Sequence, residues 1–234
     1  MAADRALIAA VRAELAARAD AAKAPEMQRY MKSALPFYGV QSAVRKEVAR
    51  SVIPAHPLPD AVAWRDTVLA LWREAEHREE RYLALALVGD RRYRAHRTPA
   101  ALPLYDELVV TGAWWDLVDE VAGRLLGELL RRDHDALAPV LRAWARDPDL
   151  WKRRAALVAQ VNLRDDVDLA LLHDVIEPNL RDPDFFMRKG IGWALRSYAK
   201  VDPDEVVRYC EQHAAELSPL SRREALRNVA GLAR

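Results

Sequence analysis

The residues best suited to carry chemistry lie in one short stretch, Trp114-Trp115-Asp116-Leu117-Val118-Asp119. In a helix, Trp115 and Asp119 stand four residues apart and share one face, and Trp114 and Val118 share another, which we assign to the core. A carboxylate can stabilise developing positive charge or activate a water molecule, and an indole face attracts cations. The spacing leaves two interpretations open: a functional carboxylate, or one that only neutralises Arg154.

Cations stand at the start of the two helices that follow. Trp151-Lys152-Arg153-Arg154 comes after Asp147-Pro148-Asp149, and Arg188-Lys189 comes after Asp182-Pro183-Asp184. The helix dipole disfavours cations near a helix N-terminus, but amide groups and basic side chains together suit a phosphate. Salt bridging between helices remains the alternative.

A stripe of basic and aromatic residues follows on one helix face. Lys189, Trp193, Arg196 and Lys200 fall at i, i+4, i+7 and i+11. Cations interleaved with an aromatic ring suit a polyanion that carries π faces. The glycines of Gly190-Ile191-Gly192 disfavour a helix, so they predict a close approach by a neighbouring helix or by a ligand.

A repeat positions these residues. The Asp-Pro-Asp stretches are 35 residues apart, and the same step relates Asp119, Arg154 and Lys189. Apolar residues recur at helical spacing, and two helices per unit indicate a solenoid. We predict an all-α, right-handed helical-repeat solenoid, a single domain over 1–234, with the aligned helices on its concave face. Asp149 and Asp184 themselves are explained by helix capping. The alternating helices are expected at about 133–146, 167–180 and 203–216.

Composition narrows the class of protein. Lys and Arg total 36 against 35 Asp and Glu, a net charge of +1, so an anion-binding surface must come from local arrangement. There is one cysteine, Cys210, and neither a secretory signal nor an apolar stretch near ~18 residues. The six histidines have no metal-ligand spacing, and no nucleotide-binding loop occurs. We expect a cytoplasmic monomer without metal, cofactor or membrane contact.

Six stretches of the sequence resemble the alkylpurine DNA glycosylases of the AlkD type, also called DNA alkylation repair enzymes. The double tryptophan with Val-Asp and the string Gly-Trp-x-Leu-Arg-x-Tyr-Ala-Lys are the most specific. The matching stretches are Met27–Lys32, Phe37–Gln41, Trp114–Asp119, Trp151–Ala156, Gly190–Lys200 and Pro219–Ala225.

The resemblance implies HEAT-like repeats and a role for individual residues. Asp119 matches the catalytic carboxylate, Trp115 and Trp193 match an aromatic pair, Arg154 matches a phosphate-side arginine, and Tyr30 matches a tyrosine near the lesion. With the basic residues singled out above, the expected DNA-binding set is Tyr30, Arg153, Arg154, Arg188, Lys189, Arg196 and Lys200.

The implied activity is excision of a damaged base from duplex DNA in base excision repair. The substrate would be a cationic N3- or N7-alkylated purine, such as 3-methyladenine or 7-methylguanine, released by hydrolysis without strand cleavage. The alternative is a non-catalytic helical scaffold that binds damaged or branched DNA, or a protein partner, through the same face.

Overall fold

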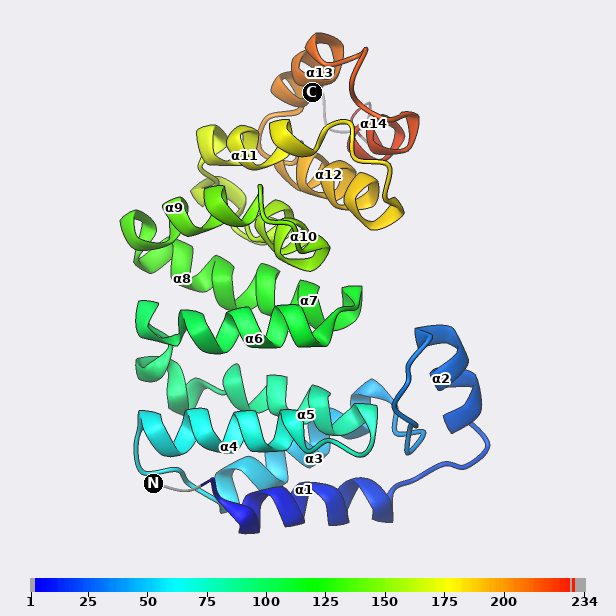
Figure 1. The fold of residues 1–234 in the computed structure, drawn as a ribbon, viewed down its shortest axis with the longest axis vertical. Coiled ribbons are helices and arrows are strands. Elements are labelled where there is room, and N and C mark those ends of the chain that lie inside the picture. The colour runs from blue at the N-terminus through cyan, green and yellow to red at the C-terminus, as the bar shows by residue number, and fades with distance from the viewer. Residues whose placement is uncertain (1–2, 228, 230–234) are drawn as a thin grey trace. The chain divides into compact units, whose positions relative to one another are not determined.

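A computed structural model describes residues 3–227 and 229 (Figure 1). All regular elements in these residues are helical, which confirms the all-α prediction. None of the helices described is long and apolar enough to cross a membrane. The chain divides into two compact units, Met1–His96 and Arg97–Arg234, and the expectation of one continuous domain stays a prediction.

The first unit holds five α-helices. A loop between the second and third is fixed by the fully buried Glu79, whose carboxylate accepts hydrogen bonds from the amides of Tyr38, Gly39 and Val40 at 3.1, 2.9 and 3.0 Å. Gly39 has a φ of +86°, which favours glycine. The helices are α1 (Arg5–Ala17), α2 (Ala24–Met31), α3 (Ser42–Ala55), α4 (Ala61–Arg73) and α5 (Arg78–Val88).

The second unit repeats pairs of helices. The helix that starts at α7 packs against α10, α10 packs against α12, and α12 packs against α14. Between them lie α9, α11 and α13, each within two residues of its expected start and shorter at its end. The bounds are α6 (Leu102–Gly112), α7 (Trp115–Glu120), α8 (Gly127–Arg132), α9 (His134–Trp144), α10 (Leu150–Val158), α11 (Leu169–Ile176), α12 (Phe185–Tyr198), α13 (Pro203–Gln212) and α14 (Pro219–Ala225).

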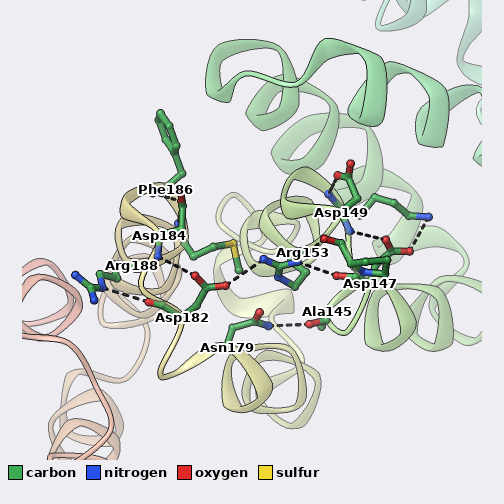
Figure 2. A network of polar contacts seen from close by, with 12 residues as sticks. Ala145, Asp147, Asp149, Arg153, Asn179, Asp182, Asp184, Phe186 and Arg188 are labelled. Atoms are coloured by element: carbon green, nitrogen blue, oxygen red, sulfur yellow. Dashed lines mark hydrogen bonds and ion pairs between the residues drawn. The ribbon is translucent and has the colours of Figure 1, made fainter.

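The Asp-Pro-Asp stretches start α10 and α12 in the same way (Figure 2). Asp149 accepts from two amides of the first turn of α10 at 2.8 and 3.0 Å, and Asp184 does so in α12 at 2.7 and 3.2 Å. The capping interpretation of both residues is therefore confirmed. Arg153 of α10 also donates to the carboxylate of Asp182 at 3.1 Å, which ties one repeat to the next.

The two glycines of α12 allow its neighbours to approach. A Cβ at Gly192 would lie 2.5 Å from the Cβ of Glu224 and 2.8 Å from the carbonyl oxygen of Ser221, both in α14. A Cβ at Gly190 would lie 3.3 Å from a guanidinium nitrogen of Arg154 in α10. Of the two alternatives that the sequence left open, close approach by a neighbouring helix is thus observed.

Replacing Gly192 by alanine should destabilise the protein. The new methyl group overlaps the α14 backbone, so we expect Gly192→Ala to lower the free energy of unfolding by about 1–3 kcal/mol, despite the better helix propensity of alanine. Gly190→Ala is the matched control and should cost less, because its nearest neighbour is the end of a side chain. Urea denaturation of both variants tests this, and equal stabilities would contradict the close packing of α12 and α14.

Candidate functional site

Trp115 and Asp119 lie on α7, which packs against α10. The continuation of this helix packs against the turn that follows α10. After Glu120 the helix continues through a π-helical segment, Val121–Leu126, into α8. A Cβ at Gly127 would lie 2.7 Å from the carbonyl oxygen of Ala159, so only glycine permits this approach. π-Helical turns within α-helices often accompany functional sites.

Asp119 forms a bidentate ion pair with Arg154 of α10. Nε and a terminal nitrogen of the guanidinium each donate to one carboxylate oxygen at 2.8 Å. The remaining terminal nitrogen donates to the carbonyl oxygen of Phe186, at the start of α12, at 2.5 Å. Arg154 is buried, whereas the side chain of Asp119 remains 15% exposed. The carboxylate therefore keeps access to solvent while the guanidinium behind it does not.

This geometry bears on the two interpretations of Asp119. Arg154 does neutralise it, as one of them required, and all three guanidinium nitrogens of Arg154 already have protein partners. The arrangement favours a role for Arg154 in holding the carboxylate over the expected direct contact with a DNA phosphate. It is also compatible with a functional carboxylate, because Asp119 is the more exposed member of the pair.

Two opposing effects set the ionisation of Asp119. Burial raises the pKa of the carboxyl group above its usual range, and the hydrogen bonds and positive charge of Arg154 oppose that rise. The guanidinium is always protonated, so it favours the carboxylate form. Asp119 thus loses its negative charge at a higher pH than a solvent-exposed aspartate would.

An aromatic cluster beside the pair was not predicted. The ring centroid of Phe186 lies 5.2 Å from those of Trp114 and Trp151. The sequence predicts Trp114 on the core face with Val118, but Trp114 is only partly buried and Val118 alone is fully buried. The helical spacing does not apply to Trp114, because it is the N-cap of α7 and has extended backbone angles.

A second carboxylate joins two of the predicted cations. Glu224 of α14 pairs with Lys189 at 2.9 Å and with Arg196 at 2.5 Å, both on α12. The hydrogen bond from Lys189, with the charges of both cations and the hydrogen bond from Arg196, lowers the pKa of Glu224 against the effect of burial. The carboxylate therefore stays ionised well into the acidic range.

Glu224 was missed, although the repeat could have located it. One further step of 35 residues from Lys189 reaches Glu224. The position that holds Asp119, Arg154 and Lys189 in three successive repeats thus holds a glutamate in the fourth. We call these four residues the charge ladder. Its ends are acidic and its middle is basic, and ion pairs join its first two and its last two members.

The other expected site residues are less closely joined. Trp115 and Trp193 are both partly exposed, and the described residues show no ring contact between them. Lys200 is exposed just after α12, and Arg188 donates to the carbonyl oxygen of Asp182 at 3.2 Å (Figure 2). Tyr30 lies on α2 in the first unit and is 74% exposed. The roles expected of these residues stay predictions.

Acidic, histidine and cysteine side chains do not gather into a metal-binding group anywhere in residues 3–227 or at 229.

Comparisons with known proteins agree on one family. A model of the family described as DNA alkylation repair enzyme matches residues 11–229. A solved structure described as a predicted DNA alkylation repair enzyme from Enterococcus faecalis is 26% identical, with a TM-score of 0.78, and the match covers 88% of this chain and 94% of that one. A search of curated proteins finds no significant match. The family match spans nearly the whole chain, including the charge ladder, and the chain belongs to the DNA alkylation repair enzyme family.

Proposed function

We propose that this protein is a monofunctional DNA glycosylase that hydrolyses the N-glycosidic bond of cationic N3- or N7-alkylated purines in duplex DNA. The observation that carries the proposal is Asp119, a partly exposed carboxylate held by a bidentate, buried guanidinium within a chain of the alkylation repair family. A fixed negative charge is what a positively charged sugar in the transition state requires.

The reaction needs little from the protein besides charge and position. In an N3- or N7-alkylated purine the base is already cationic, so the electrons of the bond to C1′ return to the ring without prior protonation. The deoxyribose is left with positive charge, and Asp119 stabilises it. Water then adds to C1′ and loses a proton to Asp119 or to solvent, which leaves an abasic site and the free base.

Arg154 acts in this scheme as a positioning residue. Its Nε and terminal nitrogen fix the plane of the carboxylate, and its third nitrogen ties the pair to the start of α12. A preorganised charge avoids reorientation during the reaction. Trp115, one turn before Asp119, and Trp193 supply partly exposed indole rings that suit the cationic base or sugar, with about 0.5–2 kcal/mol for each contact.

A non-catalytic scaffold is the second candidate, and one observation favours it. A purely structural carboxylate would also be paired with a buried arginine, as Asp119 is. Release of 7-methylguanine from alkylated DNA separates the two proposals, because a scaffold binds such DNA and leaves the bases in place.

Asp119→Asn should lower the single-turnover rate of 7-methylguanine release by about 10²–10⁴, because the shape is kept and the charge is lost. Affinity for DNA should be kept or slightly raised, since one negative charge near the phosphates is removed. Asp116→Asn and Glu120→Gln are the matched controls, because they lie on the same short helix and off the face of Trp115. A near-normal rate in Asp119→Asn with a loss in Asp116→Asn would assign the reaction to the other helix face.

As the pH is lowered, the rate of excision should begin to fall at a higher pH than it would if the reaction depended on a solvent-exposed aspartate. Burial raises the pKa of Asp119, so the carboxylate form that stabilises the sugar is lost earlier as the pH is lowered. The pH profile of single-turnover release, corrected for depurination without enzyme, measures this limb. The residual activity of Asp119→Asn should lack it, and an identical limb in that variant would assign it to another group.

Arg154→Ala should destabilise the fold by roughly 3 kcal/mol, because Asp119 would be left without its partner in a largely buried place. The double variant Arg154→Ala/Asp119→Asn should recover part of that loss. Arg188→Ala is the control and should cost less, since Arg188 is only partly buried. If Arg154→Ala instead melts like the wild type and loses affinity for DNA, Arg154 is a phosphate ligand.

A further inference from the structure

Glu224 has an unusual place for an acid in a stripe of cations. Its two carboxylate oxygens bind different residues, one Lys189 and the other Arg196. The two cations are seven positions apart on α12, about two helical turns, so the carboxylate bridges them along the stripe.

Gly192 is what allows Glu224 to reach this place. It lies on α12 between the two cations, and a Cβ there would lie 2.5 Å from the Cβ of Glu224. The bare backbone at this point lets α14 bring its glutamate directly against α12. The bridge therefore follows from helix packing and not from a flexible side chain at the surface.

The depth of the three side chains shows which of them faces solvent. Glu224 is 12% exposed, Arg196 27% and Lys189 38%. The carboxylate thus lies beneath the two cations and does not cover them. A lysine has three N–H donors and an arginine five. Each of these two cations contacts Glu224 through a single nitrogen within the described part of the chain.

We propose that Glu224 is a positioning residue for DNA binding, which holds Lys189 and Arg196 from beneath and keeps them apart, so that both can donate to the phosphate backbone. The inference rests on the proposed function, since duplex DNA is the ligand. Long, free cationic side chains lose rotamer entropy when they bind, and a carboxylate that already orders them reduces that loss.

The proposal predicts that removing Glu224 changes the affinity for DNA in the direction opposite to the one expected from net charge alone. Removing an acid adds one positive charge to the protein, and this alone strengthens binding to DNA. Loss of positioning weakens binding instead. We expect Glu224→Ala to lower affinity for a fluorescent duplex without a lesion by about three- to fivefold, the scale of one partly exposed charge contact, and to lower the salt slope by roughly one.

Glu211→Ala is the matched control. Glu211 is an exposed acid on α13, and its removal changes the net charge by the same amount as Glu224→Ala does. We expect the affinity of the Glu211→Ala variant for duplex DNA to be unchanged or slightly higher than that of the wild type. In a Lys189→Ala/Arg196→Ala background, Glu224→Ala should behave as this control does, because no cations remain to be held. The isosteric Glu224→Gln should fall between the wild type and Glu224→Ala, and it carries the test where the alanine variant melts at a lower temperature.

Unchanged or tighter binding by Glu224→Ala and Glu224→Gln overturns the inference and makes the carboxylate a neutral or competing group. Release of 7-methylguanine by the wild type, measured alongside, separates this failure from that of the proposed function. A wild type that binds and excises while Glu224→Ala follows Glu211→Ala refutes only the role of Glu224. A wild type without salt-dependent binding and without excision refutes both.

Discussion

A buried guanidinium needs a compensating anion and a partner for each N–H group, and Arg154 obtains them from two other helices of the second unit. Its plane connects the carboxylate of Asp119 on α7 to the backbone of Phe186 on α12, so three helices that start in successive repeats share one side chain. The alignment of those helices and the placement of the proposed catalytic acid are thus one constraint. Gly190 of α12 leaves space for the guanidinium, because a Cβ at this position would lie 3.3 Å from one of its terminal nitrogens.

The charge ladder also shows how a nearly neutral chain can expose a local positive group to solvent. The net charge of +1 argues against a generally basic surface. In the ladder the acids stand at the two ends and the cations in the middle, and each cation has a carboxylate partner. The pairs differ in exposure: Arg154 is buried behind its acid, whereas Lys189 lies above Glu224. The first pair presents a negative group to solvent and the second a positive one.

Periodicity made the helices of the second unit predictable, whereas the first unit lies outside the repeat that was identified. The 35-residue step located the aligned helices, and the Asp-Pro-Asp stretches marked two helix starts that Asp149 and Asp184 do cap. Helical spacing could not place Trp114, because an N-cap lies outside the helix whose geometry was assumed. The spacing of residues along a helix also does not report how deeply a side chain is buried, so it could not reveal that Arg154 is buried. The same 35-residue step leads from Lys189 to Glu224, but a pattern of cations on the aligned helices does not indicate an acid at that position.

In a solenoid each repeat contacts only its neighbours, so adding or removing a whole repeat disturbs only the repeats next to it. The pairing of Asp119 with Arg154 restricts that freedom here. Both partners lie in adjacent units, 35 residues apart, and an extra unit inserted between them would leave a buried arginine facing a foreign residue. The stretch from Asp119 to Phe186 thus behaves as one structural block, because Arg154 contacts both of its ends. A unit added outside this stretch would leave the pairing of Asp119 with Arg154 intact.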